Sequence, residues 1–327
     1  MRPNCDSSRG EFVKSRLTIL LIAVAWLGCA TAPAHAADAA PERRYLRIEG
    51  ADGVPLNVLE IGDPAKPTVV LVHGIGQSHA SFDAQFSDAV LTGALHVIAY
   101  DLRGHGQSGK PWTRDAYVTS EKWADDLARV IEHVHKEKVV VLGWSYGSLV
   151  VSDYLRKYGT RQLAAIALAG AYGGLTPPPP PPKEPPSPNF AADMKRMLEE
   201  QQSGDPAVRA AAIHRGVLRL TGKPMPGEWV AKSDVMGMLT ATEARRYMFD
   251  RSLDNRDLVA KINVPLLVFI GGKDGSTPEA QGRELVAQVA GARASFYTDS
   301  GHSPFAEEPL RFNAELAQFV RSVTTPK

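Results

Sequence analysis

Cysteine is almost absent from this chain, because its 327 residues include only Cys5 and Cys29. Both lie close to the N-terminus, so the remainder has no thiol. A disulfide framework, a cysteine nucleophile and a cysteine-ligated metal are thereby excluded from the rest of the chain. Folding does not require them, since a chain of this length can bury a core large enough to be stable without disulfide bonds.

An excess of charge of one sign is also missing. Lys and Arg total 37 and Asp and Glu total 36, which gives a formal net charge of +1. No basic stripe with interleaved aromatic residues occurs, so nucleic acid is not expected as a partner. The histidines do not fall at the spacing of metal ligands, and His73 and His105 are expected to hydrogen-bond backbone in turns. We therefore expect neither a metal nor an organic cofactor.

The N-terminus lacks an apolar run long enough to be a typical membrane span. The stretch Leu17–Leu27 is short for that purpose, follows several basic residues and precedes Ala34-His35-Ala36, whose small residues suit a cleavage site. This order is typical of a secretory signal peptide. We expect residues 1–36 to be removed and the protein to be exported to the periplasm or the medium, without a stable membrane span after cleavage. An N-terminal membrane anchor is the alternative.

Two finer features of this leader leave the route of export open. Ser8–Lys14 partly resembles a twin-arginine motif, but Gly10 occupies the place of the second arginine, which favours Sec-type export. Leu27-Gly28-Cys29 partly resembles the cleavage box of lipoproteins, but Trp26 stands where that box usually has leucine. Lipid attachment at Cys29 is therefore a minority alternative.

Short apolar runs without alternation recur along the rest of the chain. They are Val69–Val72, Val97–Tyr100, Val139–Leu142, Ala164–Ala169 and Leu266–Ile270, with Phe296–Tyr297 as a shorter candidate. Such runs are typical of parallel strands that helices cover on both faces. Two alternating stretches between Tyr45 and Leu59 flank the turn-forming pair Asp52-Gly53 and predict a hairpin.

Helical patterns separate these runs. One apolar face begins at Trp123, and a second helix is expected to follow Ser145 and to end near Gly159. A third helix is expected after Pro304, with Leu310 on its apolar face. Strands that alternate with helices predict an α/β fold with a mostly parallel, doubly wound sheet.

Residues 171–263 interrupt this alternation, because they carry helical patterns and no convincing strand. We interpret them as a helical cap inserted between two parts of the core, residues 37–170 and 264–327. The proline run Pro177–Pro182 predicts a stiff polyproline II spacer at the start of the cap. A ligand for a proline-recognition domain is the alternative.

Methionine is concentrated in the same segment. Apart from Met1, every methionine lies between Met194 and Met248. Methionine adapts to irregular apolar surfaces, so the cap is expected either to line an adaptable pocket with Trp229 and Phe249 or simply to pack against the core.

The pentapeptide Gly143-Trp144-Ser145-Tyr146-Gly147 is the first motif that indicates chemistry. It follows one predicted strand and precedes a predicted helix, which is the context in which G-x-S-x-G forms a tight turn that exposes the serine. The flanking glycines avoid the clashes that side chains would make there. Ser145 is therefore the predicted nucleophile.

A serine nucleophile needs a base, and the base needs an acid to orient it. His302 follows the last predicted strand, and Asp274 follows the strand Leu266–Ile270, so both lie at carboxyl ends of strands. Asp299 is a rival acid, but it lies only three residues before His302 on one short loop. Asp101 is the other rival. We predict that Asp274 is the acid.

Further residues follow from the same pattern. His73-Gly74-Ile75-Gly76 succeeds the strand Val69–Val72, and the backbone amides of Ile75 and Tyr146 are predicted to form an oxyanion hole. Gly104–Gly109 fits a dinucleotide motif, but no helix begins there, so a structural turn is favoured. Glu307 and Glu308 are expected in the first turn of the last helix, where the dipole favours acids.

At this point the chain resembles the α/β-hydrolase superfamily, in the serine-nucleophile branch that includes cofactor-free esterases and haloperoxidase-like perhydrolases. The resemblance rests on His73-Gly74, Asp101–Ser108, Gly143–Gly147, Gly272-Lys273-Asp274 and Gly301-His302, and it covers about residues 45–327. It implies an α/β-hydrolase fold and gives Asp101 a turn-stabilising role. Epoxide hydrolases and haloalkane dehalogenases of this superfamily use aspartate at the elbow, and Ser145 argues against both.

The expected function is that of an exported carboxylesterase-like hydrolase of small acyl compounds, which works through an acyl-enzyme. A cofactor-free perhydrolase is one alternative, and a non-enzymatic ligand-binding member of the fold is another. The sequence does not identify the bond that is cleaved, the substrate or the oligomeric state.

Overall fold

The computed structural model describes residues 42–179 and 189–324. The predicted leader, both cysteines and most of the proline-rich spacer lie outside these residues. The predictions of signal-peptide cleavage, Cys29 lipidation and a polyproline II spacer therefore stay predictions.

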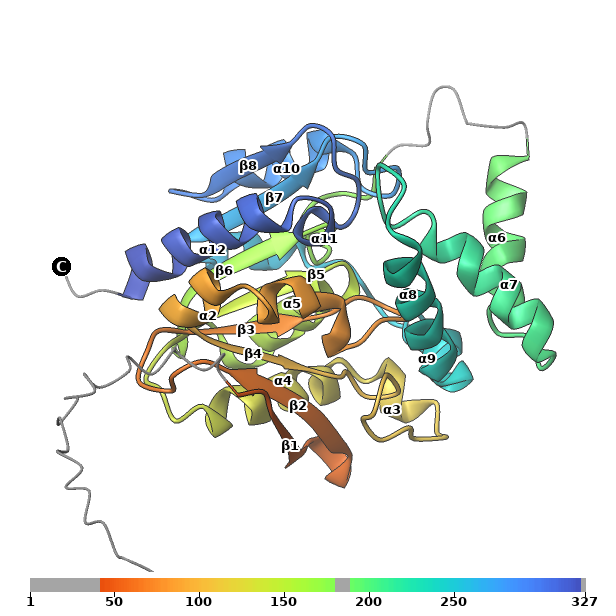
Figure 1. Ribbon diagram of the computed structural model, residues 1–327, viewed down its shortest axis with the longest axis horizontal. Helices are drawn as coiled ribbons and strands as arrows, with labels where there is room; N and C mark the ends of the chain where they lie inside the picture. Colours follow the sequence, from red (N-terminus) through yellow and green to blue (C-terminus); the bar gives the residue numbers. More distant parts are fainter. Residues whose placement is uncertain (1–41, 180–188, 325–327) are drawn as a thin grey trace, which may run out of the picture. The chain divides into compact units, whose positions relative to one another are not determined.

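An eight-stranded sheet forms the centre of the fold, in the order β1-β2-β4-β3-β5-β6-β7-β8 (Figure 1). The strands are β1 (Arg44–Glu49), β2 (Pro55–Ile61), β3 (Thr68–Val72), β4 (His96–Tyr100), β5 (Val139–Trp144), β6 (Leu163–Ala169), β7 (Leu266–Gly271) and β8 (Arg293–Tyr297). Strand β2 pairs antiparallel with β1 and with β4, whereas every pairing from β4 to β8 is parallel. The predicted fold class, the hairpin and all six predicted runs are confirmed.

Helices cover both faces of this sheet, and each face has its own apolar core (Figure 1). One core packs α4 (Ser120–His133), α5 (Tyr146–Tyr158) and α10 (Glu279–Gln288) onto the sheet. The other packs α1 (Asp83–Phe86), α2 (Ala89–Ala94) and α12 (Pro309–Thr324) onto the opposite face. The five central strands, β4, β3, β5, β6 and β7, are therefore buried on both faces, which explains why their sequences do not alternate.

The described residues between β6 and β7 form four α-helices. They are α6 (Phe190–Glu200), α7 (Pro206–Val217), α8 (Gly227–Leu239) and α9 (Thr242–Tyr247), followed by the 3-10 helix η3 (Arg256–Lys261). The described residues of this interval contain no strand. The shorter elements elsewhere are η1 (Ala51–Gly53), η2 (His79–Phe82), α3 (Asp115–Val118) and α11 (Pro304–Glu307). Among the described helices, none combines the length and the apolar character needed to cross a bilayer.

The single helix predicted after Pro304 is two helices, α11 and α12, separated at Glu308. Pro309 has no N–H to donate to the Phe305 carbonyl, so a continuous helix would leave that carbonyl without its partner. The side-chain amide of Gln85 donates to it instead, with Nε2 2.9 Å from the oxygen. The break is therefore stabilised by a residue far away in the sequence.

This break corrects two sequence predictions. Glu307 lies in the first turn of α11 as expected, but Glu308 lies between the helices. Leu310, which was placed on the apolar face, is 79% exposed. Both predictions were wrong because they assume a single continuous helix through Pro309, whereas the chain forms two helices there.

A buried ion pair joins the hairpin to helix α4. The Arg103 guanidinium donates to both carboxylate oxygens of Asp126, at 2.7 Å each, and the two side chains are 0% and 1% exposed. The Asp126 carboxylate also accepts from the Ala51 amide at 2.8 Å, and Arg103 Nη1 donates to the Ala116 carbonyl. Nearly every polar atom of the pair thus has a partner, as a buried pair requires.

We expect Asp126→Ala to lower the free energy of unfolding by about 3–5 kcal/mol, because it leaves the buried Arg103 charge without its carboxylate. The matched control is Asp125→Ala on the same helix. Asp125 pairs with Lys157 where both side chains are partly exposed, so its loss should cost less than about 1 kcal/mol. Urea unfolding of the three proteins measures both values, and equal losses would contradict the prediction.

Candidate active site

Ser145 occupies a strained turn between β5 and α5. Its backbone has φ 54° and ψ −120°, a region that non-glycine residues rarely adopt and that costs on the order of 1–3 kcal/mol. A Cβ on Gly147 would lie 2.1 Å from the Val72 carbonyl oxygen, and one on Gly143 would lie 2.7 Å from the Ser148 Cα. The two glycines of the motif are therefore required by close packing of the turn against β3 and against itself.

The loops after β7 and β8 bring Asp274 and His302 together. His302 Nδ1 lies 2.8 Å from Asp274 Oδ2, and the two side chains are 7% and 2% exposed. The other oxygen, Oδ1, accepts from the Ser276 and Thr277 amides at 2.8 and 3.1 Å. Because the carboxylate accepts at Nδ1, the proton of a neutral imidazole resides there and Nε2 keeps its lone pair.

The two rival acids lie elsewhere. Asp299 is 74% exposed and accepts from Lys273 Nζ at 2.9 Å. Asp101 accepts from the amides of His79 and Gln107, at 2.8 Å each, and contacts the His79 ring. Of the three aspartates considered, the structure brings Asp274 alone to His302.

The loop after β3 lies directly beside Ser145. A Cβ on Gly74 would come within 2.9 Å of the Ser145 Cβ, so the loop approaches the serine as closely as glycine permits. His73 holds this loop, because its Nδ1 contacts the Gly74 carbonyl at 2.7 Å and its Nε2 accepts from the Leu102 amide at 2.9 Å. Burial lowers the pKa of His73 to about 4, so the ring is neutral at physiological pH. His73 and His105 both bond backbone, as predicted.

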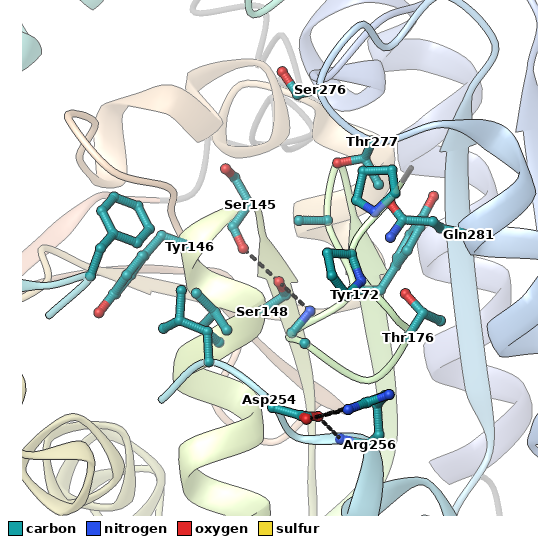
Figure 2. Close-up of a pocket in the computed structure, with 18 of the residues that line it drawn as sticks. Ser145, Tyr146, Ser148, Tyr172, Thr176, Asp254, Arg256, Ser276, Thr277 and Gln281 are labelled. Carbon is teal, nitrogen blue, oxygen red and sulfur yellow. Dashed lines mark hydrogen bonds and ion pairs between the residues drawn. The ribbon is translucent and has the colours of Figure 1, made fainter. Parts of the chain in front are cut away.

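Ser145 lies at the junction of two cavities. The first has a volume of about 550 Å³ and is lined by Ser145, Tyr146, Ile75, Tyr172 and Thr277, among others. In Figure 2, Ser145 lies between Tyr146 on one side and Tyr172, Thr176 and Gln281 on the other. The second, which we call the cap-side cavity, measures about 310 Å³ and is lined by Ser145, Ile75, His302 and residues of α6–α9. Ile75 and Tyr146, the predicted oxyanion residues, thus share a cavity with Ser145, and their role stays a prediction.

The cap contributes to both cavities only in part as expected. Phe249 lines each of them, and Met194 and Met197 line the cap-side cavity. Trp229 instead belongs to a separate hollow formed with Thr221 and Met225, so its placement in the pocket was wrong. Residue type identified Trp229 as a possible lining residue of the cap, but it does not indicate which hollow the side chain lines.

Several residues that support this site were not found by sequence reasoning. Glu307 accepts from the Gly301 amide with Oε1 and from the Gly222 amide with Oε2, both at 2.8 Å. It therefore fastens the His302 loop to the cap. Trp144 Nε1 donates to the His302 carbonyl at 2.9 Å. A carboxylate at the start of a helix was the only sequence signal for Glu307, and that signal points to the helix dipole rather than to this loop.

A second buried ion pair connects the cap to helix α5, which follows Ser145. Arg251 donates to both oxygens of Asp153 at 2.7 and 2.8 Å, and the two side chains are 4% and 3% exposed. The same guanidinium donates to the Tyr146 hydroxyl at 3.0 Å. Tyr146, the residue after Ser145, is therefore held by its hydroxyl as well as by its backbone at the start of helix α5.

These groups form an arrangement suited to nucleophilic catalysis at serine. The Asp274–His302 pair leaves a basic nitrogen in the cavity that Ser145 lines, and the helix that begins at Tyr146 presents its positive end there. Within the described ranges, no group of three or more His, Cys, Asp or Glu residues is placed to hold a metal ion.

Comparison with known proteins gives one family. The model described as the alpha/beta hydrolase family matches residues 69–315. The superfamily protein YisY of Bacillus subtilis is 28% identical over 281 residues, which cover 85% of this chain and 99% of YisY. The bifunctional esterase/perhydrolase DCH of Acinetobacter calcoaceticus is 26% identical, with 83% of this chain and 98% of DCH covered.

The solved structures agree with these sequence relatives. The esterase RhEst1 of Rhodococcus sp. ECU1013 superposes with a TM-score of 0.73 and 27% identity, covering 85% of this chain and 99% of its own. A bromoperoxidase of Bacillus anthracis, at 22% identity and a TM-score of 0.69, shares the fold.

We expect Glu307→Gln to slow the reaction of Ser145 with a fluorophosphonate by about 10- to 100-fold, because an amide nitrogen would then face a backbone N–H and the His302 loop would shift. The matched control is Glu308→Gln. Glu308 accepts from the Ser300 hydroxyl, which a glutamine oxygen can still do. Labelling rates followed by mass spectrometry measure the effect, and equal rates in wild type and Glu307→Gln would refute it.

Proposed function

The chain belongs to the α/β hydrolase family, and from this premise we propose that it is a serine hydrolase that cleaves esters of small molecules. Ser145 is the nucleophile, His302 the general base and Asp274 the acid that orients the base. The observation that carries the proposal is the 2.8 Å contact of His302 Nδ1 with Asp274, in a cavity that Ser145 shares with His302. Relatives named as esterases support the bond type.

The first half of the reaction forms an acyl-enzyme. Ser145 Oγ attacks the ester carbonyl carbon while His302 Nε2 takes the hydroxyl proton, and Asp274 stabilises the resulting imidazolium. The carbonyl oxygen becomes an oxyanion, which the amides of Ile75 and Tyr146 stabilise, each worth roughly 3–4 kcal/mol in the transition state. The carbon–oxygen bond to the alcohol then breaks, and the alcohol leaves with the proton from His302.

The second half of the reaction returns the enzyme. His302 takes a proton from water, the hydroxide attacks the acyl carbon, and the acid leaves as Ser145 regains its proton. The two cavities that Ser145 lines, of about 550 and 310 Å³, have room for an acyl group and an alcohol of small-molecule size.

Perhydrolysis is the second candidate. In that reaction hydrogen peroxide replaces water as the nucleophile, so the acyl-enzyme yields a peracid. The bifunctional esterase/perhydrolase of Acinetobacter calcoaceticus, which is matched over 98% of its length, favours it. Both reactions share the acyl-enzyme and differ only in the second nucleophile.

Export remains part of the proposal. The basic residues, the apolar stretch Leu17–Leu27 and the small residues at Ala34-His35-Ala36 support a leader that is cleaved before Ala37. The hydrolase would then act outside the cytoplasm.

We expect Ser145→Ala to abolish both fluorophosphonate labelling and hydrolysis of 4-nitrophenyl acetate, a loss on the order of 10⁶-fold. Asp274→Asn should lower kcat by about 10⁴-fold, because the amide favours the wrong imidazole tautomer. Asp299→Asn is its matched control and should leave kcat unchanged, since Asp299 is exposed and paired with Lys273.

Three outcomes would overturn this assignment. Folded wild type that is not labelled at Ser145 would indicate a ligand-binding protein. Activity retained in Ser145→Ala would place the chemistry elsewhere. Metal-independent bromination in acetate, peroxide and bromide that exceeds ester hydrolysis would make perhydrolysis the main reaction.

Expression of the full chain in a bacterial host tests the export proposal. We expect the mature protein to be recovered outside the cytoplasm with Ala37 as its N-terminus, measured by intact mass and N-terminal peptide sequencing. A matched variant with Leu21→Arg and Leu27→Arg should stay uncleaved in the cytoplasm, because the charges interrupt the apolar stretch. Cleavage before a lipid-modified Cys29, or no cleavage, would refute it.

A further inference from the structure

The cap-side cavity contains basic residues and apolar residues but no described acid. Core residues Ile75, Ser145 and His302 line one side, and cap residues such as Met194, Ile213 and Arg245 line the other. Arg245 lines it, whereas none of the described lining residues is Asp or Glu. Arg245 therefore brings positive charge to the cavity beside the nucleophile.

Arg245 is buried without a counterion. It is 9% exposed, and its two hydrogen bonds go to neutral acceptors, the Gln201 side-chain oxygen at 2.9 Å and the Gly237 carbonyl at 3.0 Å. Its Nε has no hydrogen-bond partner. In the described parts of the chain no carboxylate forms an ion pair with it; the charged group that acts on it is another cation, Arg209.

A purely structural role does not account for this arginine. Its bonds do join α8, α9 and the end of α6, but a neutral side chain could make the same two bonds. A buried guanidinium has five donors to satisfy and a charge that is costly to desolvate. Burial and the Arg209 charge lower the pKa of Arg245 to about 10, so it still carries its charge at neutral pH. The other buried arginines, Arg103 and Arg251, each have a bidentate carboxylate.

The Arg245 guanidinium lines the same cavity as Ser145 and His302. A Cβ built on Gly76 would be 2.8 Å from Arg245 Nη2, and one built on Gly74 would be 2.9 Å from the Ser145 Cβ. Since successive Cα atoms are about 3.8 Å apart, Gly74 and Gly76 are separated by no more than about 7.6 Å. The path through these two glycines therefore limits the distance from Arg245 Nη2 to the Ser145 Cβ to about 16 Å, and because both residues line the cap-side cavity, one bound small molecule can contact both.

We propose that Arg245 binds an anionic group of the substrate, so that the natural substrates are esters that carry a free carboxylate or a similar anion. The proposal rests on the hydrolase function proposed above and adds the class of substrate. His302, which returns the proton to the alcohol, lines this cavity and does not line the larger one. This favours the alcohol side of the ester for the anion.

The larger cavity complements this assignment. Its charged lining residues, Asp254 and Arg256, are paired with each other at 2.8 Å and in a second hydrogen bond at 2.5 Å, as Figure 2 shows. Its other walls include Leu149, Tyr172 and Phe249. It therefore suits the uncharged part of the substrate.

Two pairs of esters test the proposal, because a carboxylate and its amide differ in charge and hardly in shape. The alcohol-side pair is 4-acetoxybutanoate and 4-acetoxybutanamide, and the acyl-side pair is monomethyl glutarate and methyl 4-carbamoylbutanoate. We expect wild type to prefer the carboxylate in the alcohol-side pair by about 10- to 100-fold in kcat/KM, as a charged hydrogen bond to Arg245 implies. A preference for the carboxylate that is confined to the acyl-side pair would support the anion site but place the anion on the acyl side of the ester.

Variants of Arg245 then assign the preference to this residue. Arg245→Gln should remove it, and Arg245→Lys should restore part of it by supplying the charge. The matched control is Arg246→Gln, which removes the same charge from an exposed neighbour on α9 and should keep the wild-type ratio. The ratio between the two esters of a pair is the readout, because a merely structural loss of the cap would lower both rates together.

Binding to the inactive protein separates this proposal from the proposed function. Calorimetry of 4-acetoxybutanoate and monomethyl glutarate with Ser145→Ala should show binding of at least one of them that Ser145→Ala/Arg245→Gln loses, whether or not wild type hydrolyses esters. Wild type that prefers the amide in both pairs, or a carboxylate preference that survives in Arg245→Gln, would overturn the anion site and leave the hydrolase assignment intact.

Discussion

The strained backbone of Ser145 is the constraint around which the rest of the site is arranged. Ser145 is held at φ 54° although it has a side chain. The conformational strain costs roughly 1–3 kcal/mol, and the stability of the surrounding sheet offsets it. Ser145 keeps one tie to that sheet, because its amide donates to the Ala169 carbonyl of β6 at 2.9 Å. The turn directs the hydroxyl away from the strand, and the neighbouring backbone can approach only where Gly74 and Gly147 remove the side chain.

Close backbone approach also brings the His302 loop into place. A Cβ on Gly170 would lie 2.4 Å from the His302 carbonyl oxygen, and one on Gly271 would lie 1.9 Å from the Gly301 carbonyl oxygen. The ends of β6 and β7 therefore press against the loop that carries the base, and Glu307 accepts from its Gly301 amide. Because packing and hydrogen bonds determine the loop together, the imidazole is oriented before any substrate arrives, which is how such sites reduce reorganisation during the reaction.

The sequence indicates those parts of the site that local pattern determines. The strand–glycine–serine–glycine–helix order places Ser145, and strand ends place Asp274 and His302, because parallel strands deliver their following loops to one edge of the sheet. Glu307 and Gln85 could not be found in this way. Their partners are the Gly222 and Gly301 amides and the Phe305 carbonyl, and backbone partners have no sequence signature. Arg245 was not predicted for a different reason. Its lack of a counterion depends on how the cap helices pack, which the sequence pattern does not indicate.

The proposed anion site would discriminate between substrates because Arg245 has no counterion among the described residues, which disfavours the binding of neutral esters. A neutral ester would fill the cap-side cavity and still leave the Arg245 charge desolvated without a counterion, so it is disfavoured by a penalty as well as by a missing attraction. Binding energy of that kind is available at a fixed distance from Ser145, because Arg245 is held by Gln201 and Gly237, and the Arg251–Asp153 pair fastens the same part of the cap to α5. In this proposal the cap does more than enclose the site, because it supplies the cation that would select the substrate.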